Sequence, residues 1–252
     1  MSKIVLAFDF DGVIIDTAYE SYLISARTYN EMTGKNAISE KNAAQYSKGR
    51  AFSLNAETNY TLIKMIDENP CLDFSTLSQS QFDSLVTQNK EIGKIFEEKF
   101  FQTRNKIEGT PEWFDMQKPF FGIIDTLAQL AKKYPLYIVT TKPRLTVIAT
   151  LDYFKIEVPC EKVLSERVIH TKENLLKEVA EKENVLISRV VLIDDAIKQL
   201  IKAKEVDAKT ILVMWGEKRE LFEIEAKKQN VSIAYSPKDC EKIILAIGNS
   251  KN

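Results

Sequence analysis

Two aspartates near the start of the sequence, Asp9 and Asp11, are spaced so that both carboxylates can act at one point. They directly follow residues 4–8, an apolar run rich in β-branched and aromatic residues, which is typical of a strand buried on both faces. Gly12 allows a tight turn, so both side chains can converge above the strand end, where ligands bind in open α/β sheets. Adjacent carboxylates repel, and Mg²⁺ relieves this repulsion while also binding phosphate. Taken alone, the stretch also fits a turn with two solvated acids.

Further polar side chains end other apolar runs later in the chain. Thr140 and Thr141 end one of these runs, and Asp194 and Asp195 end another. Lys172 begins the predicted helix that precedes the second run. If the strands are parallel, all of these residues lie at one edge of the sheet. A nucleophilic carboxylate, a hydroxyl donor, a lysine and further carboxylates make up a set suited to phosphoryl transfer.

The elements that must position these residues fall into two regions. Residues 1–15 and 115–252 alternate apolar runs with amphipathic helices, which predicts parallel strands joined by right-handed crossovers. Residues 16–114 are helical and polar in pattern, without a strand-like run. We therefore expect an α/β fold, a doubly wound parallel sheet with an all-helical domain inserted after the first strand.

Local signals predict the helices of the inserted region. Residues 17–20, Thr-Ala-Tyr-Glu, match a capping box and predict the start of its first helix. Apolar periodicity predicts further helices near residues 52–68 and 79–104.

Composition excludes several classes of function. The 252 residues include 35 Lys and Arg against 36 Asp and Glu, so the net charge of −1 provides no general attraction to nucleic acid. Cys71, Cys160 and Cys240 are widely separated and lack metal-binding spacing, which indicates reduced thiols in a cytoplasmic protein. No apolar run approaches the ~20 residues that span a membrane. We expect no nucleic-acid or membrane partner, and the sequence leaves the oligomeric state open.

Four segments, in this order, resemble the haloacid dehalogenase (HAD) superfamily, whose members are mostly phosphatases with an aspartate nucleophile. The segments are Asp-Phe-Asp-Gly-Val-Ile-Ile-Asp-Thr at 9–17, Tyr-Ile-Val-Thr-Thr-Lys-Pro at 137–143, Lys172, and Val-Leu-Ile-Asp-Asp at 191–195. The resemblance covers the whole chain and is to the subtype with a helical cap after the first motif, which includes phosphoglycolate phosphatases and phosphoglucomutases. It departs at Thr141, where the family usually has Asn, and at Ile193, where many relatives have Gly.

The resemblance implies a role for each motif residue in catalysis. Asp9 would attack phosphorus and become an aspartyl phosphate, and Asp11 would act as general acid and then as general base. Thr140 would bind the transferred phosphoryl group, with Thr141 beside it in substrate binding. Lys172 would neutralise Asp9 and the phosphoryl group.

The same resemblance implies a Mg²⁺ site at these strand ends. Asp9, Asp194 and the backbone carbonyl of Asp11 would bind the ion. Asp195 would be either a ligand or a support for the ligands, and it also fits a simple helix cap.

Residues 16–114 would form the cap that closes over the site and selects the substrate. In such caps a loop with glycine and a basic residue often faces the active site. Lys48, a flexible Gly49 and Arg50 stand at the corresponding place, so Lys48 and Arg50 are expected to bind substrate. A solvated turn is the alternative.

Together these features predict a magnesium-dependent phosphomonoester hydrolase that acts on a small phosphorylated metabolite. A sugar-phosphate mutase of the same family is one alternative, because it also has both aspartates. A catalytically silent binding protein on the same fold is another, because fold alone does not establish activity.

Overall fold

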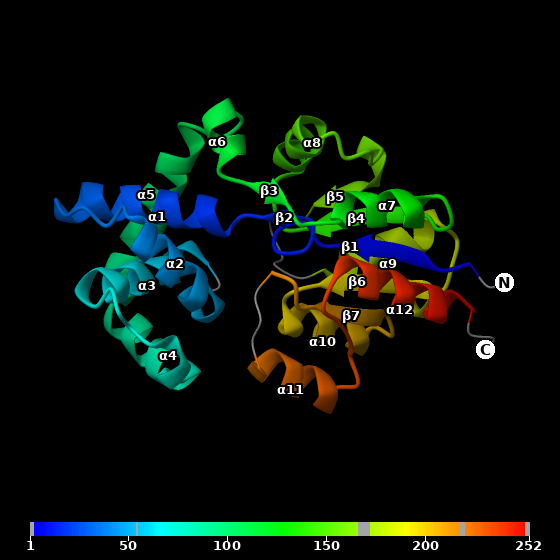
Figure 1. The fold of residues 1–252 in the computed structure, drawn as a ribbon. Coiled ribbons are helices and arrows are strands. Elements are labelled where there is room, and N and C mark those ends of the chain that lie inside the picture. Colours follow the sequence, from blue (N-terminus) through cyan, green and yellow to red (C-terminus); the bar gives the residue numbers. More distant parts are fainter. Residues whose placement is uncertain (1–2, 54, 166–171, 217–219, 250–252) are drawn as a thin grey trace. The chain divides into compact units, whose positions relative to one another are not determined.

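The strand expected at residues 4–8 lies within a six-stranded sheet in the computed structural model, which describes residues 3–53, 55–165, 172–216 and 220–249. The strand order is β5-β4-β1-β6-β7-β8, and all neighbouring strands are parallel (Figure 1). The strands are β1 (Val5–Phe8), β4 (Leu136–Thr140), β5 (Val163–Ser165), β6 (Val190–Asp194), β7 (Lys209–Val213) and β8 (Ser232–Ala234). The predicted doubly wound α/β fold is confirmed.

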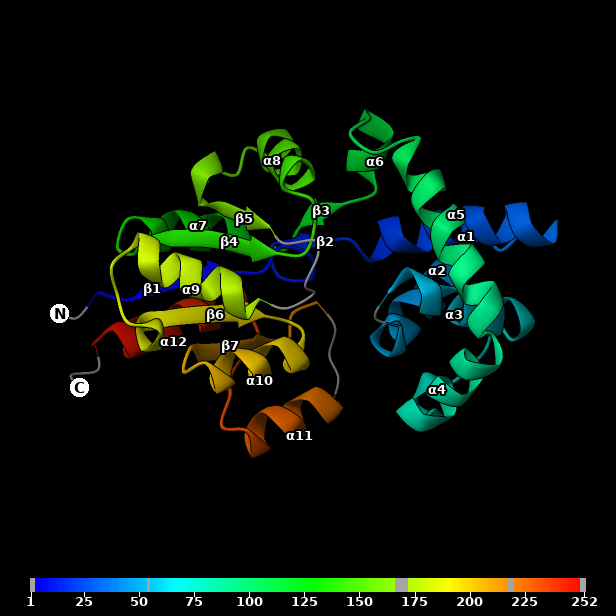
Figure 2. The same cartoon turned by 180° about the vertical axis from the view of Figure 1, so that it is seen from behind.

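Side chains along β1 alternate between two hydrophobic cores, one on each face of the sheet. Leu6 and Phe8 belong to one core, and Val5 and Ala7 belong to the other. Because both faces are covered, the strand is apolar throughout instead of alternating with polar residues. The helices over the first core are α7 (Ile123–Ala131), α8 (Arg144–Tyr153) and α12 (Pro237–Asn249). Those over the second are α9 (Glu173–Lys182), α10 (Ile197–Glu205) and α11 (Glu220–Lys228) (Figure 2).

The chain separates into two compact units, one of Met1–Asp16 with Lys118–Asn252 and one of Thr17–Gln117. It leaves the sheet unit through β2 (Ile15–Asp16) and returns through β3 (Lys118–Pro119), which pair in antiparallel fashion. The domain boundaries expected from the sequence, after residues 15 and 114, fall close to these two crossings.

The second unit is helical and has its own core. Buried aromatic side chains dominate this core, including Tyr22, Tyr46, Phe82 and Phe96. Its helices are α1 (Ala18–Thr33), α2 (Glu40–Gly49), α3 (Ala56–Glu68), α4 (Gln79–Gln88), α5 (Lys90–Asn105) and α6 (Pro111–Asp115). Across the described parts of both units, none of the helices combines the length and the apolar character needed to cross a bilayer.

Two helix boundaries in this unit differ from prediction. The helix expected at residues 79–104 is interrupted at Asn89, whose side-chain amide donates to the Leu85 carbonyl at 2.8 Å. Such local bonds from asparagine compete with continued helix, so α4 ends and α5 begins there. The helix expected from residue 52 begins at Ala56, where Asn55 and Thr58 form a capping box.

The capping box predicted at residues 17–20 was wrong. The Thr17 side chain makes no capping hydrogen bond. Glu20 is 4% exposed and faces inward, where it accepts hydrogen bonds from Arg104 Nε and Trp113 Nε1, both at 2.9 Å. The Glu20 carboxylate therefore binds side chains from other helices, whereas the capping-box pattern predicts that it binds the backbone at the start of its own helix.

Candidate active site

Asp9 directly follows Phe8, the last residue of β1, and Asp194 is the last residue of the neighbouring strand β6. Phe8 pairs with Ile193, and the Asp9 backbone N–H donates to the Ile193 carbonyl at 2.9 Å. The parallel register therefore brings the two carboxylates side by side at the carboxyl edge of the sheet. Asp9 is 8% exposed and Asp194 is fully buried. Buried carboxylates need partners, because an unpaired buried charge is costly.

Lys172 supplies the first of these partners. Its Nζ lies 2.7 Å from Asp9 Oδ1 and 2.6 Å from Asp194 Oδ2. It directly precedes α9, which packs on the same face of the sheet as Val5 and Ala7, the face to which Asp9 belongs by its period of two. Burial alone would lower the pKa of the Lys172 ammonium, but Asp194 and Asp9 outweigh it and raise that pKa above its ordinary value.

One lysine does not compensate the negative charge at this edge. Burial raises the pKa of the Asp9 carboxyl from its ordinary 3.8 to about 7; Lys172 opposes this rise, and Asp194 and Asp11 add to it. Without a further cation, Asp9 would thus be only partly ionised at neutral pH. A nucleophilic carboxylate at this position needs another positive charge nearby.

Asp195 adds a third carboxylate to the same cluster. One oxygen each from Asp9, Asp194 and Asp195 lies within 4.8 Å of the others. Gly12 makes room for Asp195, because it has φ +78° and a Cβ at this position would collide with the Asp195 carboxylate. The three carboxylates supply hard oxygen donors, and the negative charge of one of them, Asp9, is only partly balanced by Lys172. This set of donors fits a magnesium ion.

The two threonines after β4 have different environments. Thr140 is 2% exposed, and its Oγ1 accepts a hydrogen bond from the Lys142 backbone N–H at 3.1 Å. The hydroxyl proton can therefore point toward an anion at the sheet edge. Thr141 is exposed, so its expected part in substrate binding stays a prediction.

Sequence reasoning missed Lys142. Its side chain is 4% exposed, its Nζ lies 2.8 Å from Asp11 Oδ1, and it stands 5.3 Å from the centre of the Phe10 ring. The available signal was its place two residues after Thr140, just past the end of β4 and hence at the same edge as Asp11. Counting only Lys142, Lys172 and the four carboxylates described here, two negative charges remain when all four acids are ionised. One divalent cation would neutralise them.

Lys48 and Arg50 lie in the helical unit, and the flexible loop expected around them was wrong. Lys48 and Gly49 end α2, and Arg50 begins a short 3₁₀-helix, Arg50–Phe52. Gly49 is buried, and a Cβ there would collide with Leu62 and Phe74, so the glycine serves close packing. Lys48 is exposed, and Arg50 Nη1 donates to the Thr17 carbonyl at 3.3 Å within the same unit.

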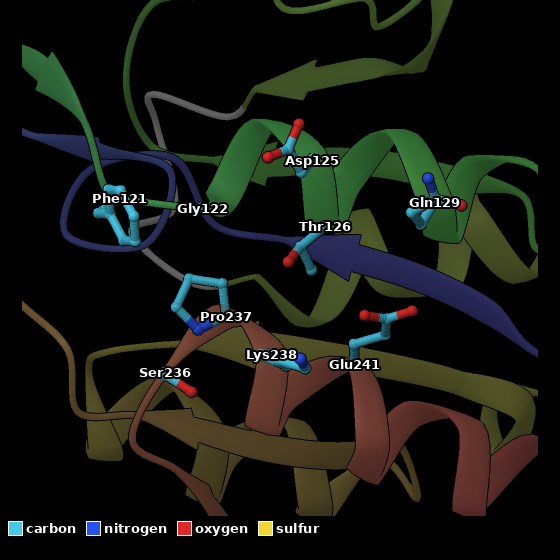
Figure 3. Close-up of a pocket in the computed structure, with 9 residues that line it drawn as sticks. All are labelled: Phe121, Gly122, Asp125, Thr126, Gln129, Ser236, Pro237, Lys238 and Glu241. Carbon is cyan, nitrogen blue, oxygen red and sulfur yellow. The ribbon is translucent and has the colours of Figure 1, made fainter.

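A separate pocket of about 320 Å³ opens between the amino-terminal parts of α7 and α12. Phe121, Thr126, Pro237 and Glu241 are among its lining residues, as Figure 3 shows. None of the predicted site residues lines it, so it is distinct from the carboxylate cluster.

Comparison with known proteins agrees with this geometry. The sequence pattern of haloacid dehalogenase-like hydrolases matches residues 6–213, which span the motifs from β1 to β7. The chain belongs to this family. No protein of curated function matches this HAD sequence significantly.

Solved structures similar to this HAD chain confirm the fold over nearly its whole length. A predicted phosphatase from Clostridium acetobutylicum has a TM-score of 0.64 and 18% identity, covering 97% of this chain and 100% of that one. A predicted phosphoglycolate phosphatase from Haemophilus somnus has a TM-score of 0.64 and 14% identity, covering 96% and 98%. A HAD family hydrolase from Deinococcus radiodurans, with bound phosphate and sodium, has a TM-score of 0.61 and 11% identity, covering 98% and 96%.

Proposed function

We propose that this HAD hydrolase is a magnesium-dependent phosphomonoester hydrolase that works through an aspartyl phosphate. The observation that carries the proposal is the position of Asp9. Its carboxylate is buried at the end of the central strand, contacts Lys172 at 2.7 Å and lies with Asp194 and Asp195 in one oxygen cluster. A nucleophile, a fixed ammonium and a divalent-cation site at one point are the parts that phosphoryl transfer requires.

Asp9, Asp194 and Asp195 would hold the metal ion, together with the backbone carbonyl of Asp11. When bound, Mg²⁺ would neutralise the excess negative charge and bind oxygens of the phosphoryl group. The residues fit this ion because they offer hard oxygen donors and too few positive charges of their own.

Each side chain at the carboxyl edge of the sheet would then have its own role in the reaction. Asp9 attacks phosphorus in line, so a bond from its carboxylate oxygen to phosphorus forms as the ester P–O bond breaks. Asp11 donates its proton to the departing oxygen, then accepts a proton from the water that attacks the phosphorus and releases the Asp9 carboxylate. Lys172 holds Asp9 in place, and the Thr140 hydroxyl donates to a phosphoryl oxygen.

We propose a small phosphorylated metabolite as the substrate, with the helical unit as a lid that selects it. The net charge of −1 supports a small-molecule substrate over nucleic acid. Lys48 and Arg50 are the basic groups of the lid that we propose contact the substrate, since arginine binds anions through two parallel hydrogen bonds. The cytoplasmic location expected from the cysteines stays a prediction.

The test is phosphate release from p-nitrophenyl phosphate and from a panel of phosphorylated metabolites, with and without Mg²⁺. Wild-type protein should release inorganic phosphate only with the metal, and Asp9→Asn should release none while it keeps its fold by circular dichroism. A phosphoryl group retained on the organic product would indicate a mutase. No release from any ester, by folded and Mg²⁺-loaded protein, would support a silent binding protein.

A further inference from the structure

We propose that Lys142 is a positioning residue that fixes the orientation of the Asp11 carboxylate. This inference rests on the proposed function, in which Asp11 is the general acid. It goes beyond it by assigning a role to a lysine outside the predicted catalytic set.

The ion pair between Lys142 and Asp11 is unequal in exposure. The lysine side chain is 4% exposed, whereas the aspartate side chain is 35% exposed, and the two are joined at 2.8 Å through Oδ1. The ammonium is thus the fixed partner, and the carboxylate remains open to the site. A buried ammonium needs a counter-ion, and the Asp11 carboxylate provides one.

The backbone and stem of Lys142 are themselves held in place. Its N–H donates to Thr140 Oγ1 at 3.1 Å, and its carbonyl accepts a hydrogen bond from Ser165 Oγ. Its ammonium stands 5.3 Å from the centre of the Phe10 ring. These contacts come from β4, β5 and the residue next to Asp11, so the ammonium is positioned by the sheet.

The other partner has a fixed backbone as well. Directly after Asp11, the Gly12 N–H donates to the Ile15 carbonyl at 2.9 Å. Trp215 Nε1 donates to the Val13 carbonyl at 3.0 Å. These two bonds hold the main chain directly after Asp11, and the contact from Lys142 to Oδ1 restricts rotation of the carboxylate.

The contact holds one of the two oxygens of the Asp11 carboxylate, because the Lys142 ammonium donates to Oδ1 at 2.8 Å. Lys172 makes the corresponding contacts with Asp9 and Asp194, so each of the two reacting carboxylates has its own lysine.

Two aryl esters of similar shape test this role, because phenol needs protonation as it leaves and p-nitrophenol needs little. We expect Lys142→Met to lower kcat roughly tenfold more on phenyl phosphate than on p-nitrophenyl phosphate, within the range of general acid catalysis. Asp11→Asn should show the same preference, and adding Lys142→Met to Asp11→Asn should cause little further loss. Lys142→Arg, which keeps the charge, should recover part of the rate on phenyl phosphate.

Lys162→Met is the matched control, because Lys162 also stands 5.3 Å from an aromatic ring, that of Tyr137, without contacting a site carboxylate. It should leave the ratio of the two rates unchanged. If Lys142→Met does not fold, Lys142→Gln with the same substrate pair replaces it, since glutamine keeps a donor. Equal losses on both esters, or additive losses in the double variant, would overturn the role of Lys142 while leaving the phosphatase intact. Failure of wild-type protein to hydrolyse either ester would instead overturn the proposed function, and the Lys142 role with it.

Discussion

Lys172 contacts Asp9 at 2.7 Å, yet the pKa of Asp9 is raised to about 7 instead of lowered. Burial outweighs the lysine, and the carboxylates of Asp194 and Asp11 add to its effect. Ionisation of Asp9 is therefore unfavourable with these neighbours alone, and a further cation nearby would favour it. Metal binding and the pH dependence of stability can therefore both be measured to test the charge balance around Asp9.

The first prediction concerns the metal-free protein. A carboxyl whose pKa is raised on folding contributes stability at low pH, and this is lost as pH rises from about 4 through about 7. In EDTA, Asp9→Asn should therefore raise Tm at pH 8, by roughly 2–4 °C for each kcal/mol of repulsion removed, and change it little at pH 5. Asp152→Asn, at an exposed aspartate, is the control. Equal effects of Asp9→Asn at both pH values would contradict this account.

The second prediction concerns Asp194. Asp194→Asn can keep the hydrogen bond that the Ala196 N–H donates to Oδ1 at 2.8 Å, but it removes the charge. It should raise the Mg²⁺ concentration needed for half-maximal activity by roughly tenfold or more, with partial recovery at high Mg²⁺. Calorimetric titration of Mg²⁺ separates binding from turnover. An unchanged titration would remove Asp194 from the proposed metal ligands.

The third prediction concerns Gly12. Gly12→Ala introduces a Cβ that collides with Asp195 and places alanine at φ +78°. It should weaken Mg²⁺ binding as well as stability. Gly122→Ala is the matched control, because Gly122 has φ +79° and open space around it, so only backbone strain of about 1 kcal/mol applies. Normal Mg²⁺ affinity in Gly12→Ala would show that Asp195 does not need its present position.

The sequence predicted that Asp9 and Asp194 share one sheet edge because each stands at the end of an apolar run, and the parallel pairing of β1 with β6 places both at that edge. The doubly wound sheet followed from its apolar runs in the same way. The place of Lys142 just after a strand end was a weak signal, since such a lysine looks like any surface lysine until its contacts with Phe10 and Asp11 are known. Glu20 was misread because a capping box is a local pattern, whereas its partners lie in distant helices.

The fourth prediction concerns the stability of the helical unit. Glu20→Gln removes the charge from a buried ion pair with Arg104, whose side chain is 13% exposed, which should cost about 3–5 kcal/mol. Glu112→Gln is the matched control, because Glu112 forms an exposed ion pair with Arg27 and should cost less than about 1 kcal/mol. Chemical denaturation of the full chain measures both. Similar costs for the two variants would show that burial of the Glu20 pair contributes little.

The most direct test of the central claim is to look for phosphate on Asp9 itself. Wild-type protein turning over p-nitrophenyl phosphate with Mg²⁺ would be quenched rapidly in acid, digested and examined by mass spectrometry. We predict one added phosphoryl group on the peptide that contains Asp9, absent from Asp9→Asn and from samples without Mg²⁺. Turnover by the wild-type protein without any labelled Asp9 peptide, or substantial turnover by Asp9→Asn, would contradict the covalent mechanism.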